Sequence, residues 1–230
     1  MNECPNCNKK YKSIGIHWNY CGHPELSQHQ KDMLIGGLMS DATVTDGGNI
    51  PQFTIYNTNK EFLQWYCDEL GFLSNDVRLY EDGKSKHQRN IKNSFDVERN
   101  ANYKDVYCMT TAAHPYNHSL RDWYQSGKKE YPKNIKLTKD ILKIWYCGDG
   151  NVNWDTKSSG YCEIGCINEI DNEQKVLSLF DDTMFNPTFS NGRIRFNGQS
   201  KEFLDFISPV PNGMEYKWCI DNRNKYNKLI

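Results

Sequence analysis

The spacing of apolar residues predicts two helices of the same kind, each followed by an acidic residue. Ser27 and Gln30 stand three residues apart, the spacing of a capping box, and predict a helix over residues 31–40. Thr138 begins a second helix, predicted over residues 139–148. Each helix thereby brings one carboxylate to its C-terminal end: Asp41 and Asp149.

Segments in which apolar and polar residues alternate follow each helix, and their order repeats. Residues 52–56 place Phe53 and Ile55 on one face, as a half-buried strand does, and residues 161–166 alternate in the same way. Each of these strands precedes a predicted helix and a later strand: helices over 61–70 and 168–179, strands over 77–80 and 192–196. The chain therefore carries two copies of a β-β-α-β-β unit, the first lengthened by an insertion near residues 84–102.

Composition sets limits on the class of protein. Hydrophobic residues are 37% of the 230 and aromatic residues 13%, enough for a sizeable core. The mean hydropathy is −0.81 and no apolar run reaches the length of a membrane span, so we expect no membrane partner. The N-terminal residues lack the basic and apolar regions of a secretory signal. We therefore expect an intracellular protein of the cytoplasm, nucleoid or organelle matrix, not a secreted one.

The charge is uneven along the chain although its sum is nearly zero. The net charge of −1 gives no overall argument for binding to nucleic acid. Residues 84–136, however, hold eleven Lys or Arg against five Asp or Glu, and residues 168–182 hold five acids and one lysine. A near-neutral protein can therefore carry one basic face.

Three of the nine cysteines lie in the N-terminal segment, at the spacing of a structural zinc site. Cys4 and Cys7 form a C-x2-C pair, and His17 and Cys21 follow as a second pair. Four protein ligands leave no open position, so the predicted Zn²⁺ is structural and supplies the folding energy of a segment too short for its own core. His23 is an alternative to Cys21, and an unstructured tail with reactive thiols is the alternative to the site as a whole.

Two aspartates at the ends of packed helices create a need for a cation. Each carboxylate would sit at the negative end of a helix dipole, and the two would repel each other. Gly36 and Ser40, on one helical face, are small enough to let two helices approach closely. Oxygen ligands with room for water suit Mg²⁺ (or Mn²⁺), and paired metals between carboxylates hydrolyse phosphodiesters. The alternative is that Asp41 and Asp149 are ordinary helix-terminal residues.

Several segments resemble the LAGLIDADG homing endonucleases of the monomeric, two-motif type. They are the two signature motifs, the mid-chain block before the second motif, and a closing helix with its M-x-Y-K element: residues 34–42, 142–150, 123–138 and 207–217. The first motif ends in Ala42 where glycine is usual, and Gly148 stands in the second where another acid is frequent. The resemblance covers residues 26–218 and leaves out the N-terminal cysteines.

The resemblance implies an α+β fold of two pseudo-symmetric α-β-β-α-β-β-α repeats. Their two antiparallel sheets would form a saddle in the major groove of double-stranded DNA, with the motif helices packed at the pseudo-dyad. Three parts are expected: a zinc-binding module over residues 1–25, a first repeat over 26–135 and a second over 136–230. The implied protein is a monomer that uses divalent metal ions to cut both strands at a long recognition site.

The resemblance also assigns roles to individual residues. The metal-binding acids carry over to Asp41 and Asp149, and the basic residues that flank the active site match Lys129 and Lys217. A lysine near the scissile phosphate can orient water or neutralise developing charge, whereas the alternative is a solvated surface lysine. Polar positions of the strands, and two lysines of the loop that follows residue 80, are candidates for DNA contact: Gln52, Thr54, Tyr56, Arg78, Tyr80, Lys84, Lys86, Arg193 and Arg195.

A binding protein that does not cut is the alternative function on the same scaffold. It would be an intron RNA maturase, with intron RNA as its partner, or a DNA-binding regulator. The presence of both aspartates favours cleavage, because a pure binder has no need of them. A zinc-dependent hydrolase is not expected, since the zinc site is closed, and an intein-embedded nuclease is not expected either, since no terminal splicing residues are present.

Overall fold

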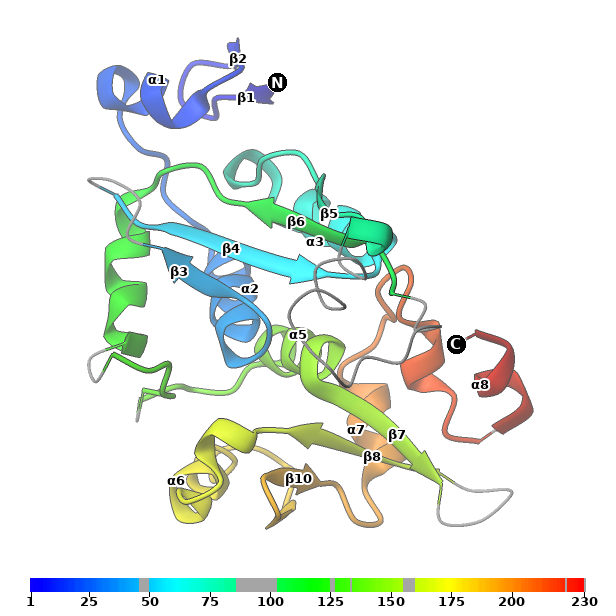
Figure 1. Ribbon diagram of the computed structural model, residues 1–230. Helices are drawn as coiled ribbons and strands as arrows, with labels where there is room; N and C mark the ends of the chain where they lie inside the picture. The colour runs from blue at the N-terminus through cyan, green and yellow to red at the C-terminus, as the bar shows by residue number, and fades with distance from the viewer. Residues whose placement is uncertain are drawn as a thin grey trace.

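Two helices packed against each other occupy the middle of the molecule (Figure 1). They are α2 (Gln28–Met39) and α5 (Lys139–Asp149), and the computed structural model places a four-stranded sheet on either side of them. The structure describes residues 1–45, 50–85, 103–124, 127–132, 134–154, 160–221 and 223–229.

Capping residues fix where both central helices begin, as the sequence predicts. The Ser27 hydroxyl accepts a hydrogen bond from the Gln30 N–H, and the Gln30 side chain accepts one from the Ser27 N–H. The Thr138 hydroxyl accepts a hydrogen bond from the Ile141 N–H. Each cap satisfies N–H groups that have no partner within the helix, so both predicted helix starts are confirmed.

Small residues at the contact bring α2 and α5 close together. A Cβ atom on Gly36 would lie 2.7 Å from the Cβ of Ile144, and one on Gly148 would lie 2.4 Å from the Cβ of Ser40. Gly36 and Ile144 hold equivalent positions in the two motifs, as do Ser40 and Gly148. Each glycine thus faces the larger residue of the other copy, and a side chain at position 148 would push the helices apart.

The two sheets have the same strand order, and all neighbouring strands are antiparallel. The first sheet has the order β3-β4-β6-β5: β3 (Thr43–Thr45), β4 (Gln52–Asn57), β6 (Val106–Thr110) and β5 (Arg78–Glu81). The second has the order β7-β8-β10-β9: β7 (Gly150–Trp154), β8 (Gly160–Gly165), β10 (Arg193–Arg195) and β9 (Thr188–Ser190). The expected α+β fold with two pseudo-symmetric sheets is confirmed.

Aromatic side chains fill the space between each sheet and the helices that cover it. Under the first sheet, Phe53 of β4 stacks on Tyr66 of α3 (Lys60–Leu70). Under the second, Phe196 stacks on Phe203 of α7 (Ser200–Phe206), with ring centroids 3.8 Å apart. All four rings are buried, so one face of each sheet belongs to the core and the other stays polar.

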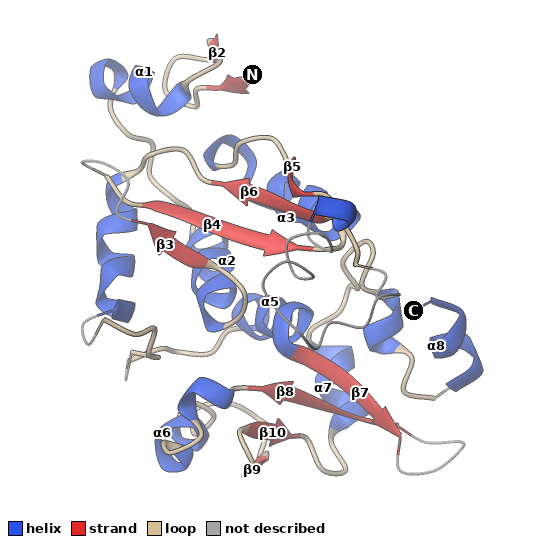
Figure 2. Cartoon of the chain, viewed as in Figure 1, coloured by secondary structure: helices blue, strands red, loops and turns tan. Residues whose placement is uncertain are grey.

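The N-terminal residues form a small unit of their own beside the first sheet (Figure 2). It consists of β1 (Asn2–Glu3), β2 (Lys10–Tyr11) and α1 (Ile14–Cys21). Trp18 of α1 is 1% exposed and its ring meets the rings of Phe72 and His114 edge-on. The unit is therefore packed on the first repeat and is not a loose tail.

One expectation from the sequence needs correction, and another lies mostly outside the described residues. The helix predicted over residues 168–179 is wrong: η3 (Ile167–Glu169) and α6 (Glu173–Ser178) stand there, separated by a turn. The Asp171–Asn172 pair favours a turn, since both side chains compete with the backbone for hydrogen bonds. The expected insertion near residues 84–102 lies mostly outside the described residues.

The remaining elements are all helical. They are η1 (Gly71–Leu73), η2 (Pro115–Tyr124), η4 (Glu215–Trp218) and α8 (Arg223–Leu229). Among the described residues, no helix combines the length and apolar character that crossing a membrane requires.

Candidate active site

Both motif aspartates lie at one end of the central helix pair. Asp149 is the last residue of α5, and Asp41 comes two residues after the end of α2. A Cβ atom on Gly148 would be 3.5 Å from the Asp41 carboxylate, which shows how close that carboxylate lies to the end of α5. Both aspartates open into a pocket of about 270 Å³, which Lys129 and Tyr131 also line. The structure thus brings together the two acids that the sequence places 108 residues apart.

The two carboxyl groups, of which Asp41 is exposed and Asp149 half-buried, have pKa values above their usual range. Desolvation raises the pKa of Asp41, and the nearby Lys217 and Lys129 oppose that rise. Desolvation, and then the charge of Asp41, raises the pKa of Asp149 to about 7. A divalent cation would relieve both effects, and two carboxylates at an open pocket are the oxygen ligands that Mg²⁺ or Mn²⁺ prefers. The donor set therefore fits the metal implied by the sequence.

The two predicted lysines each bind the C-terminal end of one central helix. The Lys129 ammonium donates hydrogen bonds to the carbonyls of Ser40 and Ala42, just after α2. The Lys217 ammonium donates to the carbonyls of Cys147 at 2.6 Å and Gly148 at 2.9 Å, in the last turn of α5. A positive charge at a helix C-terminus satisfies free carbonyls and opposes the helix dipole.

Burial also lowers the pKa of both lysines. Lys217 is 6% exposed, so neither it nor the half-buried Lys129 is a solvated surface lysine. Desolvation lowers the pKa of both side chains, while the two aspartates oppose that shift for each. Two acids and two bases at or near the pocket therefore influence one another's pKa values.

Two residues that sequence reasoning did not select anchor the segment that carries Lys129. The Tyr131 hydroxyl donates to the Met39 carbonyl at 2.9 Å, and the Tyr131 N–H donates to the buried Glu169 carboxylate at 2.8 Å. Glu169 also pairs with Lys175. Tyr131 belongs to the mid-chain block that resembles the family, so a signal for it existed, whereas nothing in the sequence pointed to Glu169.

The polar face of the first sheet carries most of the candidate DNA-binding residues of that repeat. Gln52, Thr54 and Tyr56 share the face opposite to the core. Tyr80 is 59% exposed and its ring meets that of Tyr56 edge-on, next to the exposed Arg78. Thr54, however, is only 4% exposed, which argues against direct contact between its side chain and a base.

A buried acid organises the polar face of the second sheet. Arg193 and Arg195 both pair with the carboxylate of Glu163, which is 2% exposed on the neighbouring strand β8. The two guanidinium groups remain partly open to solvent. Sequence reasoning found the arginines but missed the acid that holds them.

The two lysines predicted to contact DNA phosphates differ in what the structure says of them. Lys84 is an exposed residue near the end of the first sheet, and Lys86 lies outside the described residues.

The four predicted zinc ligands come together in the N-terminal unit. The ligand atoms of Cys4, Cys7, His17 and Cys21 all lie within 4.8 Å of one another. The sulfurs of Cys4 and Cys21 are 4.0 Å apart, close to the roughly 3.8 Å edge of a tetrahedron of sulfurs around Zn²⁺. The ring of His23 instead packs against Trp18. Among the described residues, this cluster could hold one zinc ion, with Cys21 as its fourth ligand.

Comparisons with known proteins agree with this architecture. The profile of the LAGLIDADG DNA endonuclease family matches residues 31–194. An uncharacterized protein of Methanocaldococcus jannaschii is 24% identical over 137 residues, which are 59% of this chain and 48% of that protein. The chain thus spans about half the length of this curated relative.

A solved structure has a fold similar to that of this chain. The homing endonuclease I-WcaI bound to its DNA recognition sequence superposes with a TM-score of 0.71 at 15% identity, over 94% of this chain and 95% of that one. At this identity the likeness concerns the fold alone. The family profile spans most of the chain and covers parts of both motif helices and of both sheets. The chain belongs to the LAGLIDADG DNA endonuclease family.

Proposed function

We propose that the protein is a homing endonuclease that cuts both strands of DNA at one long site with the help of divalent metal ions. The observation that supports this most strongly is the pair Asp41 and Asp149, which lie at the joined ends of α2 and α5 and open into one pocket. A protein that only binds nucleic acid has no need of two repelling carboxylates there.

Each residue of the pocket has a separate task in this proposal. Asp41 and Asp149 would hold Mg²⁺ or Mn²⁺, which supplies Lewis acidity and an activated water when bound. Lys129, which lines the pocket, is placed to neutralise charge that develops on the cleaved phosphate. Lys217 fixes the end of α5 through three carbonyls and so holds Asp149 in position.

The sheets would supply recognition of double-stranded DNA. Exposed Gln, Arg and Tyr side chains on the polar faces can reach base edges in the major groove. Because one chain contains both sheets and both acids, we expect a monomer to be the active form. We also keep the division into a zinc-binding module (1–25), a first repeat (26–135) and a second repeat (136–230) as part of this proposal.

Selection from a randomised duplex library tests the function. The protein is incubated with the library in Mg²⁺ or in EDTA, and cut ends are sequenced. We expect one family of related sites, cut on both strands, only in Mg²⁺. A library that yields bound duplexes but no cut ends in Mg²⁺ or Mn²⁺ would instead support the non-cleaving alternative.

Replacing the two lysines should lower cleavage more than binding. We expect Lys129→Met and Lys217→Met each to reduce the single-turnover cleavage rate by about 10²–10³-fold, because each removes a fixed positive charge beside the pocket. Lys139→Met, at the exposed start of α5, is the matched control. Thermal melting of each variant shows whether a lower cleavage rate comes from the missing charge or from a helix end that has lost its capping lysine. Wild-type rates in both variants would contradict the roles proposed for these lysines.

Glu163 should matter for sequence discrimination although it is buried. Because its carboxylate holds two arginines, Glu163→Gln frees both guanidinium groups and removes one negative charge from the DNA-binding face. We expect stronger binding to unrelated duplexes and a loss of about 1–3 kcal/mol of preference at particular base pairs, as for Arg195→Ala. Lys84→Ala is the contrast, and should weaken binding to all duplexes alike. Unchanged preference in Glu163→Gln would overturn this role.

A further inference from the structure

The N-terminal unit is fixed on the first repeat by several independent contacts. His114 donates a hydrogen bond from Nε2 to the Pro24 carbonyl at 2.8 Å, and the Asn2 amide donates to the Ser74 carbonyl. A Cβ atom on Gly15 of α1 would lie 3.1 Å from the backbone nitrogen of Ala113, so the two backbones touch. The position of α1 relative to the first sheet is therefore set by the fold.

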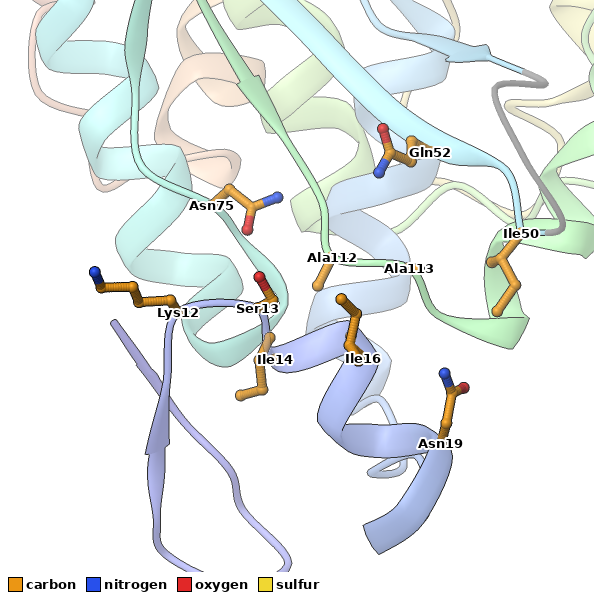
Figure 3. Close-up of a pocket in the computed structure, with 11 residues that line it drawn as sticks. Lys12, Ser13, Ile14, Ile16, Asn19, Ile50, Gln52, Asn75, Ala112 and Ala113 are labelled. Carbon is orange, nitrogen blue, oxygen red and sulfur yellow. The ribbon is translucent and has the colours of Figure 1, made fainter.

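This arrangement leaves a groove of about 410 Å³ between α1 and the sheet (Figure 3). One wall comes from the N-terminal unit and the other from the end of the first sheet and the loops beside it. The side chains that define it are Lys12, Ser13, Ile16 and Asn19 on one side, with Gln52 and Asn75 on the other. Ile16 is 64% exposed here and does not pack around the cysteine cluster.

The groove continues the polar face of the first sheet. Gln52 is the first residue of β4 and shares its face with Tyr56. The Asn75 amide donates to the hydroxyl of Thr110, which pairs with Thr54 in the middle of that same face. A ligand lying along the polar face and passing the end of β4 would therefore enter the groove.

The chemistry of the walls favours a phosphodiester backbone. Among the described residues that line the groove, Lys12 alone carries a charge, and none is a carboxylate. The other polar groups are a hydroxyl and three amides, from Ser13, Asn19, Gln52 and Asn75. Ammonium, hydroxyl and amide groups are the side-chain donors that contact DNA phosphates. Such a wall attracts a polyanion without selecting one base over another.

We propose that this groove holds the sugar-phosphate backbone of the target duplex just beyond the part covered by the first sheet. The N-terminal unit then lengthens the recognition site on one side only, and the cysteine cluster serves to hold α1 in place. This inference rests on the proposed function, because it takes the polar face of the first sheet as the DNA-binding face.

Binding to trimmed duplexes tests the inference. The duplex selected from the randomised library is shortened at either end in turn, and affinity is measured for the wild type and for Lys12→Gln/Asn19→Ala across a salt series. Lys10→Gln, on β2 and outside the groove, is the control of equal charge change. We expect the double variant to bind the full duplex roughly three- to tenfold more weakly, with a salt slope smaller by about 0.9.

The same series separates this inference from the proposed function. Trimming one particular end should weaken the wild type and the control but leave the double variant unchanged, while cleavage at the central site is kept. If a duplex is selected and cut, yet the double variant loses no affinity or trimming affects all three proteins equally, the groove does not hold DNA. If no duplex is cut in the first place, the proposed function fails instead.

Discussion

Asp41→Asn and Asp149→Asn are each expected to abolish cleavage of both strands while leaving DNA binding intact. The amide has nearly the shape of the carboxylate but gives a metal ion no charge partner, so a loss of more than about 10³-fold in single-turnover rate is expected. The measurement is cleavage of the selected duplex in Mg²⁺, with binding measured in parallel in Ca²⁺. Asp205→Asn, on the exposed side of α7, is the control. A variant that still cuts both strands at the wild-type rate would contradict the assignment.

Asp149→Asn should also stabilise the metal-free protein, to a degree that depends on pH. Burial and the charge of Asp41 raise the pKa of Asp149 to about 7 from its usual value of 3.8. The folded protein therefore binds this proton more tightly than the unfolded chain, and the resulting stability is present below about pH 4 and lost as the pH rises through 7. At pH 8 in EDTA, Asp149→Asn should melt at a higher temperature than the wild type, by about 2–4 °C for each kcal/mol gained when the desolvated charge is removed. Equal melting temperatures at pH 8 would mean that the pKa of Asp149 is not raised in the folded protein.

Replacing two cysteines of the N-terminal cluster should remove all the zinc from the protein. Cys4→Ser/Cys7→Ser leaves at most two of the four ligands, and hydroxyl groups do not replace thiolates on Zn²⁺. We expect one zinc per chain in wild-type protein purified without chelator and none in the variant, measured by atomic emission. The rest of the fold should persist, because most residues of the core lie downstream of the cluster.

A matched control distinguishes this site from the other cysteines. Cys219→Ser changes a buried thiol that lies outside the cluster and bonds to the Glu215 carbonyl, so it should keep its zinc. Equal zinc content in wild type and Cys4→Ser/Cys7→Ser would contradict the site. Zinc lost from both variants would point to general unfolding.

The features that the sequence predicts well are those set by local rules. Ser27 and Thr138 are helix caps whatever the tertiary structure, and the alternation of apolar residues in β4 marks its buried face. The cysteine spacing likewise selects ligands within one short segment. Strands β3, β7 and β9 were expected only as parts of a repeat, because three to five residues with few apolar positions carry no period of their own.

The features that the sequence could not predict depend on contacts between distant residues. Nothing in the sequence distinguishes Glu163 and Glu169 from solvated acids, yet both are buried in the structure and bind basic or backbone groups. The burial of Thr54 depends on its neighbours across the sheet, Thr43 and Thr110. The groove beside α1 exists only because the N-terminal unit packs on a particular edge, and no local pattern specifies that edge.

Strand-resolved cleavage at equal amounts of protein and duplex tests whether one chain, with Asp41 and Asp149 in one pocket, cuts DNA. The selected duplex carries a different end label on each strand, and single-turnover products are followed in Mg²⁺ and in EDTA. We expect one wild-type chain per duplex to cut both strands at one site in Mg²⁺ and neither strand in EDTA. Cleavage in EDTA, or cleavage that needs two chains per duplex, would contradict it.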